Sequence, residues 1–341
     1  MKDSSVSVFV SVIVPVYNDA ARLRLCLQAL AAQTYAKQFS LETNRASEYR
    51  ASEYRESEYR ESEYEVIVVD NGSDAAENIA ALTAEFPFVV YAYEGAPGAY
   101  AARNRGLEIA KGEVLAFTDA DCIPATDWLE KGLRYLQQVP NCGLVAGRVT
   151  LFFQGDRANS IELYESVTAF PQQRLLTQQR GAATANVFTL RSVINAVGPF
   201  NARLKSQGDL EWGRRVYEAG YAQVYAHDLC VAHPARHTWA QLYRRTKRLA
   251  GGAFGRLMDV QDKTLQDATW QSKALTRHWQ FVRLLLEDLL PPVNFTLSVL
   301  KDSRLKGLRA KLTVPLVLVW VRCISAVEKL RLRFGGVPYR G

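Results

Sequence analysis

Short apolar runs alternate with segments of helical periodicity along the first 140 residues of the chain. Each run is rich in β-branched residues and ends in turn residues, which is typical of buried strands. The predicted strands are 9–16, 65–70, 89–93 and 114–118, and the predicted helices are 19–33, 75–85 and 99–110, with another after Asp127. This alternation predicts a Rossmann-like α/β fold, with a mostly parallel sheet and helices on both faces.

The pattern changes in the second half of the chain. It is mixed after 143–151 and becomes helical over 209–219, where Gly220 follows as a C-terminal cap. Beyond Thr238 the periodicity is helical throughout. We therefore expect an α/β domain over 1–237, with halves of about 8–125 and 140–237, followed by a helical region over 238–341.

A pentapeptide repeat interrupts the predicted sheet. Residues 45–64 read RASEY twice and then RESEY twice. A period of five matches neither a helical face nor strand alternation, and lengthening a surface loop costs only about 0.6 kcal/mol per doubling. We expect a tolerated loop insertion that is dispensable for chemistry. A charged helical protrusion that binds a partner is the alternative.

Positive charge is concentrated at the C-terminal end. The net charge is +7, and residues 301–341 hold ten Lys and Arg against two acids. The apolar run 312–321 spans about half of the ~20 residues that cross a bilayer. We expect this basic, amphipathic tail to lie on an anionic membrane surface, with ordinary helical packing as the alternative. Nucleic acid is not an expected partner, because aliphatic residues rather than stacking aromatics separate the basic ones.

The cysteines and the N-terminal residues indicate a cellular location. Five widely spaced cysteines without a C-x-x-C pair suggest reduced thiols in the cytosol, with no disulfide frame and no zinc cluster. Serines and Pro15 break the apolar stretch 6–16, so we expect a first strand there rather than a signal peptide. With the basic tail, this predicts a cytoplasmic protein, peripheral on the cytoplasmic face of a membrane.

Two carboxylates follow the fourth predicted strand. Asp119 and Asp121 are separated by one alanine and precede a capped helix. Ligands of parallel α/β sheets bind at the carboxyl ends of the strands. Mg²⁺ or Mn²⁺ binds one or two carboxylates and completes its shell with water and phosphate oxygens. The pair therefore predicts a site for a divalent cation, whereas capping aspartates in a turn are the alternative.

Asp70 ends the second predicted strand and precedes Asn71-Gly72. The Asn-Gly pair makes a tight turn, which explains Gly72. The turn explains Asp70 less well. At the carboxyl end of a buried strand, its carboxylate is placed to accept hydrogen bonds from a base or a ribose.

Four segments occur in an order that resembles family 2 glycosyltransferases of the GT-A fold. They are VIVPVYN at 12–18, VVDNGS at 68–73, ARNRG at 102–106 and FTDAD at 117–121, and they cover residues 8 to about 125. The resemblance implies a nucleotide pocket formed by Pro15, Tyr17, Asp70 and Arg103. It also implies a metal held chiefly by Asp121, with Asp119 toward the ribose. The family is inverting.

Two later stretches extend the resemblance. In Gly208-Asp209-Leu210-Glu211, many members carry a Glu-Asp pair and one carboxylate is the general base. Gly208 replaces the Glu here, so Asp209 is the implied base, and a helix N-cap is the alternative. His233 resembles the histidine that completes the metal shell in many members. Arg236 is a candidate for a phosphate contact, and equally for a contact with an acidic surface. Asn186 lies where the family meets donor sugar or acceptor.

The implied reaction is a single in-line displacement in which a sugar moves from a nucleotide-sugar donor to an acceptor hydroxyl. We expect a UDP-sugar carrying a hexose or an N-acetylhexosamine, with a glycolipid or lipid-linked acceptor. Exopolysaccharide or cell-wall synthesis is the alternative, and a non-catalytic sugar-nucleotide-binding protein at the membrane is a rival of another class. The turn after the first strand lacks the glycines of a dinucleotide-binding enzyme or a nucleotidyltransferase.

Overall fold

The computed structural model describes residues 8–35, 63–204, 206–264 and 270–337. Residues 45–62, which hold most of the predicted repeat insertion, lie outside this range. The chain divides into two compact units. Unit 1 comprises Met1–Thr150, Pro171–Ala202 and Asp209–His233, and unit 2 comprises Leu151–Phe170, Arg203–Gly208 and Pro234–Gly341.

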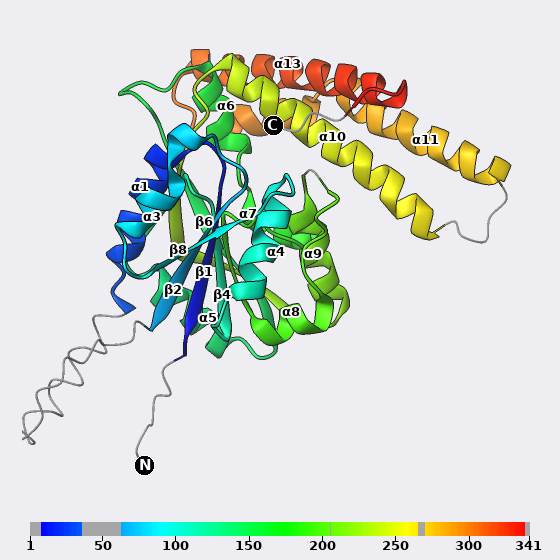
Figure 1. The fold of residues 1–341 in the computed structure, drawn as a ribbon. Coiled ribbons are helices and arrows are strands. Elements are labelled where there is room, and N and C mark those ends of the chain that lie inside the picture. The colour runs from blue at the N-terminus through cyan, green and yellow to red at the C-terminus, as the bar shows by residue number, and fades with distance from the viewer. Residues whose placement is uncertain (1–7, 36–62, 205, 265–269, 338–341) are drawn as a thin grey trace, which may run out of the picture. The chain divides into compact units, whose positions relative to one another are not determined.

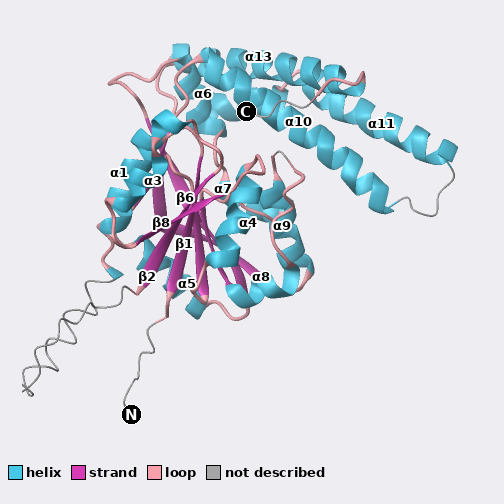
Figure 2. Ribbon diagram, viewed as in Figure 1, coloured by secondary structure: helices cyan, strands magenta, loops and turns pink. Residues whose placement is uncertain are grey.

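One sheet forms the centre of unit 1 (Figures 1 and 2). Its strands are β1 (Val10–Val16), β2 (Tyr64–Asp70), β3 (Val89–Tyr93), β4 (Val114–Thr118), β5 (Ile123–Pro124), β6 (Cys142–Phe152), β7 (Asn186–Leu190) and β8 (Ala222–Pro234). They lie in the order β3-β2-β1-β4-β7-β6-β8-β5. The pairs among β3, β2, β1 and β4 are parallel, whereas β7 pairs antiparallel with both β4 and β6. The sheet is therefore mixed, with its parallel half at the N-terminal end of the chain.

Helices cover both faces of this sheet. They are α1 (Ala20–Ala31), α3 (Ile79–Ala84), α4 (Ala99–Ile109), α5 (Trp128–Gln138), α7 (Gln172–Gln179), α8 (Arg191–Val197) and α9 (Gly208–Glu218). Figure 1 shows α1 and α3 on one side and α4 and α9 on the other. All seven residues of β2 are buried, as expected for a strand covered on both faces. The predicted α/β class is confirmed.

The helix predicted over 75–85 is interrupted. A 3₁₀ turn covers Ala75–Glu77, and α3 begins only at Ile79. Asn78 between them has a φ of 45°, in the left-handed region that asparagine tolerates better than most residues. The periodicity showed the apolar spacing but not this break in the backbone.

Gly106 brings α4 against the centre of the sheet. A Cβ at this position would lie 2.5 Å from Cγ2 of Ile13 on β1. Only glycine permits so close an approach, which fixes the distance between helix and strand. Because Arg103 lies one turn earlier on the same helix, this packing also sets the position of its guanidinium.

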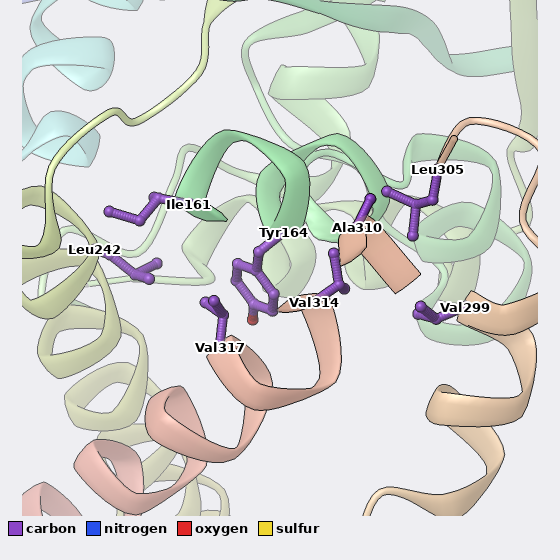
Figure 3. Close-up of a cluster of buried hydrophobic side chains, with 8 residues drawn as sticks. All are labelled: Ile161, Tyr164, Leu242, Val299, Leu305, Ala310, Val314 and Val317. Atoms are coloured by element: carbon purple, nitrogen blue, oxygen red, sulfur yellow. The ribbon is translucent and has the colours of Figure 1, made fainter. Parts of the chain in front are cut away.

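Unit 2 consists mainly of helices, which are α6 (Ser160–Thr168), α10 (Trp239–Thr264), α11 (Trp270–Leu289), α12 (Val293–Lys301) and α13 (Leu308–Arg333). Figure 3 shows a core shared by α6, α10, α12 and α13, which contains Ile161, Tyr164, Leu242, Val299, Leu305, Ala310, Val314 and Val317. Helix α6 lies before the domain boundary predicted at residue 237, but it packs against helices that lie after that boundary. Among the described helices, α13 is long and apolar enough to cross a membrane, by length and composition alone.

Candidate active site

The carboxyl ends of β1 and β2 lie side by side. Val16 pairs with Asp70, and the Asn71 N–H donates to the Val16 carbonyl at 2.9 Å. Asn18 binds the next turn, since its amide nitrogen donates to Asp74 at 3.0 Å and its amide oxygen accepts from the Asp74 N–H at 2.7 Å. These bonds lock the two turns together at one edge of the sheet, where α/β sheets bind ligands.

The predicted nucleotide-binding residues of the first two strands lie at this edge. Asp70 is buried, with Oδ1 accepting from the Ser73 N–H at 2.9 Å and Oδ2 from the Tyr91 hydroxyl at 3.4 Å. Tyr17 is 56% exposed, and Pro15 is partly buried. Both Asp70 oxygens thus contact the protein already, and the longer bond, to Tyr91, is the weaker of the two.

Arg103 connects α4 to the end of β4. Its guanidinium is buried, and Nη2 forms a 2.5 Å salt bridge with Oδ1 of Asp119. The Nε of Arg103 is also buried and has no hydrogen-bond partner among the described residues. A buried donor without a partner is unfavourable. An acceptor oxygen of a bound ligand would satisfy it.

The two carboxylates after β4 belong to a compact cluster. Ligand atoms of Asp119, Asp121 and Cys122 lie within 4.8 Å of one another. Nε2 of His233, at the end of β8, lies 3.3 Å from Oδ2 of Asp121, and Nη1 of Arg22 lies 3.5 Å from the same oxygen. The predicted ligands Asp119, Asp121 and His233 are therefore neighbours, although β4 and β8 are more than 100 residues apart in the sequence.

The chemistry of these donors fits a hard divalent cation. Carboxylate oxygens suit Mg²⁺ and Mn²⁺, and imidazole nitrogen is compatible with Mn²⁺. Burial raises the pKa of the Cys122 thiol well above its ordinary value, and the Asp119 and Asp121 carboxylates raise it further. Two of the three ligand atoms in this cluster are carboxylate oxygens, from Asp119 and Asp121.

Asp209 lies in the first turn of α9 and contacts α4. The Tyr100 hydroxyl donates to its Oδ1 at 3.1 Å, and the Leu210 N–H donates to the same atom at 3.0 Å. Burial raises the pKa of Asp209, while the positive charge of Arg103 and the Tyr100 hydrogen bond act in the opposite direction. A carboxylate with a raised pKa is a better proton acceptor than an ordinary aspartate.

Other groups of the protein bind the side chains of Arg236, Asn186 and Glu211, the last from the same segment as Asp209. In unit 2, Nη1 of Arg236 binds the buried Glu165 carboxylate at 2.7 Å. Glu211 forms an ion pair with Arg215 one helical turn later. Asn186 is fully buried, accepts from the Trp128 indole N–H and donates to two backbone carbonyls. These contacts give Glu211 and Asn186 structural roles.

Sequence reasoning did not select Tyr91, Tyr100 or Arg22. Tyr100 precedes Arg103 by one helical turn, and Arg22 follows Asp19 by one turn, so helical spacing places each pair on one face. Tyr91 occupies a partly exposed position on β3. The helical spacing of Tyr100 with Arg103, and of Asp19 with Arg22, is visible in the sequence. Arg22 does contact Asp19 at 3.4 Å. The contacts of Arg22 with Asp121, Tyr91 with Asp70 and Tyr100 with Asp209 join different elements and were not predictable from spacing.

The mixed sheet and its acidic edge define a GT-A-type glycosyltransferase. The model of the family "Glycosyl transferase family 2" matches residues 11–198, more than half of the chain, and that of "Glycosyl transferase family group 2" matches residues 114–324. The chain belongs to glycosyltransferase family 2. It is therefore an enzyme, a glycosyltransferase.

Two named relatives are also glycosyltransferases. The chain is 36% identical over 247 residues to Glycosyltransferase AglE of Haloferax volcanii, covering 72% of each protein. It is 29% identical over 211 residues to the pre-mycofactocin glycosyltransferase of Mycobacterium tuberculosis, covering 58% of this chain and 43% of that protein.

A solved structure shares the fold. The mannosyltransferase PcManGT of Pyrobaculum calidifontis, in complex with GDP-Man and Mn²⁺, superposes with a TM-score of 0.54 at 17% identity. The match covers 97% of this chain and 89% of that one. At this identity the likeness supports the GT-A fold alone.

Proposed function

We propose that the protein is a metal-dependent, inverting glycosyltransferase that moves a sugar from a nucleoside diphosphate donor to the hydroxyl of a lipid-linked acceptor. Residues 1–237 would carry the donor and acceptor chemistry, with the helical region 238–341 at a membrane. The proposal is carried by one observation. Asp119, Asp121 and His233 meet at the sheet edge, where the Asp119 side chain also contacts Arg103.

The chain's own residues have distinct roles in this proposal. Asp121, Asp119 and His233 would hold a divalent cation, which when bound neutralises charge on the departing diphosphate. Arg103 orients Asp119 through their salt bridge and offers its buried Nε to the donor. Pro15, Tyr17 and Asp70 contribute the base and ribose side of the pocket, and Arg236 is a candidate phosphate contact.

Asp209 is the proposed general base. It accepts the proton of the acceptor hydroxyl as that oxygen attacks the anomeric carbon, and the donor's sugar–phosphate bond breaks on the opposite side. The raised pKa supports this role, because proton transfer is most effective when the base titrates nearer the working pH. One displacement at the anomeric carbon inverts its configuration.

The donor is proposed to be a UDP-sugar carrying a hexose or an N-acetylhexosamine. The likeness to a structure with GDP-Man makes GDP-mannose the first competitor to test. Mn²⁺ and Mg²⁺ are both candidates for the ion. The apolar helix α13 and the basic C-terminal region support an acceptor at the membrane, with the enzyme on the cytoplasmic face.

A donor screen tests the proposal directly. Purified full-length protein is incubated with UDP- and GDP-sugars, with Mn²⁺ or Mg²⁺, and with a lipid extract, and nucleoside diphosphate release is measured. We expect metal-dependent release that increases with the lipid extract, and a product with inverted anomeric configuration. Release that requires a soluble polysaccharide instead would favour exopolysaccharide synthesis. Tight donor binding without release under any condition would favour the non-catalytic alternative.

A further inference from the structure

The outward face of α13 carries a continuous apolar stripe. Its members recur every three or four residues along the whole helix, which places them on one side of it. They are Leu308, Leu312, Leu316, Val319, Cys323, Val327 and Leu330, with Phe334 directly after the helix, and all are exposed. The exposed fractions of the aliphatic and aromatic members range from 37% to 85%. Contiguous exposed apolar surface of this kind marks an interaction site.

The opposite face of α13 is fixed inside unit 2. Ala310, Val314 and Val317 belong to the buried cluster of Figure 3. Further along the helix, Nζ of the buried Lys329 lies 2.6 Å from the Asp288 carboxylate of α11. A helix that crossed a bilayer would have to abandon this core and bring a charged residue into hydrocarbon, which is costly. The exposed stripe can therefore contact lipid, but α13 cannot cross the bilayer while its opposite face is packed in unit 2.

Cationic side chains border the stripe. Lys301, Lys306 and Arg309, around the start of α13, are exposed. None of the three has an acidic partner within the described parts of the chain. Unpaired Lys and Arg beside an apolar face are typical of helices that lie on anionic membranes.

Aromatic side chains lie beside the middle of α13. Trp239 of α10 contacts Trp320 with ring centroids 4.9 Å apart, and Tyr243 lies 6.5 Å from Trp320. Trp239 and Tyr243 are both exposed. Tryptophan and tyrosine prefer the boundary between head groups and acyl chains, because their rings are apolar at one end and polar at the other.

The neighbouring helices also carry exposed apolar residues. Lys311 and Arg322 of α13 donate to the carbonyls of Leu300 and Leu290, which places α12 and the end of α11 directly beside α13. Leu290 and Leu300 are themselves exposed. They belong to a second row of exposed residues, which comprises Leu286, Leu289, Leu290, Val293, Leu297 and Leu300.

We propose that the α13 stripe is a monotopic docking surface for an anionic lipid bilayer, with the helix lying in the plane of the head groups. This proposal names the surface of unit 2 that meets the membrane. It rests on the proposed function only in its biological role, which is to bring the enzyme to a lipid-linked acceptor. A second copy of the chain is a poorer occupant. Two such surfaces would bring their unpaired cations together, whereas phosphatidylglycerol would neutralise them.

Vesicle sedimentation with the full chain tests the surface. Wild-type protein is expected to bind vesicles of phosphatidylcholine and phosphatidylglycerol more tightly than phosphatidylcholine alone. The triple variant Leu312→Ser, Leu316→Ser, Val327→Ser should lose about tenfold or more in partitioning, since it removes three side chains that would be buried in lipid. Leu25→Ser, an exposed leucine of α1 in unit 1, is the matched control and should bind like wild type.

A second variant measures the electrostatic contribution to vesicle binding separately from the apolar contribution. Lys306→Gln with Arg309→Gln should abolish most of the preference for anionic vesicles and leave the core of unit 2 untouched, because both side chains are exposed. Equal binding by wild type, the triple variant and the charge variant would overturn the proposal. So would a wild-type dimer in solution that the triple variant converts to monomer, since a second copy would then occupy the stripe.

Cys323 is a native probe of depth. Among the cysteines that the structure describes, it is the one with an exposed side chain, and it lies near the middle of α13. A polarity-sensitive fluorophore attached there should shift to the blue on addition of anionic vesicles and be quenched by lipids spin-labelled near the head group. Stronger quenching by lipids labelled at the bilayer centre would show that α13 spans, and would overturn the monotopic arrangement. No spectral change would overturn docking itself.

These outcomes are separable from those of the proposed function. Vesicle binding needs no donor, metal or acceptor. Loss of nucleoside diphosphate release with intact vesicle binding would refute the catalytic proposal alone, whereas retained release without vesicle binding would refute only the docking surface.

Discussion

Tyr100→Phe is a selective test of the proposed base. The substitution deletes the hydroxyl that donates to Oδ1 of Asp209 at 3.1 Å and leaves the ring in place. The Leu210 N–H still donates to the same oxygen. Because the lost hydrogen bond stabilises the charged carboxylate, the pKa of Asp209 should rise further above its ordinary value.

The size of the effect follows from the bond that is lost. Hydrogen bonds to charged groups contribute roughly 1.5–3 kcal/mol. Asp209 keeps its other hydrogen bond and the nearby charge of Arg103, so we take the lower end, which is about tenfold in proton affinity. On the acid limb of the pH profile the rate should fall by about tenfold. At higher pH, where Asp209 is ionised in both proteins, the rates should converge.

The assay is nucleoside diphosphate release as a function of pH, with the donor identified by the screen. Tyr135→Phe is the matched control. It removes a similar phenol–aspartate bond, 2.7 Å long, to Asp228, which none of the proposed steps uses. The control should keep the wild-type acid limb. A uniform loss of rate at all pH values in Tyr100→Phe, with an unshifted acid limb, would refute the reasoning and make Tyr100 a packing residue.

Three further substitutions separate chemistry from stability. Asp121→Ala should reduce transfer by about 100-fold or more with little change in the thermal unfolding midpoint, because its ion pair with Arg22 is partly exposed; near-normal transfer would remove the metal role. Asp209→Asn should reduce transfer by roughly 10²–10⁴-fold while donor affinity, measured by calorimetry, is unchanged; a parallel loss of affinity would place Asp209 in the donor pocket. Gly106→Ala should lower the unfolding midpoint by roughly 3–10 °C, since its methyl group would overlap Ile13; an unchanged midpoint would show that α4 can move away from β1.

Local periodicity predicted the parallel half of the sheet well. The strands ending at Val16, Asp70 and Thr118 were placed correctly because a buried strand is a short apolar run closed by turn residues. Parallel pairing then brings their carboxyl ends to one edge, so the positions of Asp70, Asp119 and Asp121 followed from the sequence.

Contacts between distant segments were not predictable. Tyr100 meets Asp209 across 109 positions, and nothing in the local pattern joins them. Asn186 was expected near the substrate, but the sheet brings an indole N–H and two carbonyls to its amide, which therefore lies in the core. Such partners are set by tertiary packing rather than by spacing.

The length of the C-terminal helix α13 was also not predictable from its apolar run. The sequence showed an apolar run of ten residues over 312–321, containing Pro315, whereas α13 extends from Leu308 to Arg333. Charged residues break the run but not the helix, because two faces of α13 are apolar for different reasons. One face packs in unit 2, and the other is the exposed stripe.

Metal dependence is the most direct test of the central claim, that the acids after β4 hold a divalent cation used in sugar transfer. Protein treated with a chelator is titrated with Mn²⁺ in the presence of donor, while ion binding is followed by paramagnetic resonance and nucleoside diphosphate release is measured in the same samples. The account predicts that release disappears with the chelator and returns in proportion to the bound ion. Full release in the chelator, with no bound Mn²⁺, would contradict it.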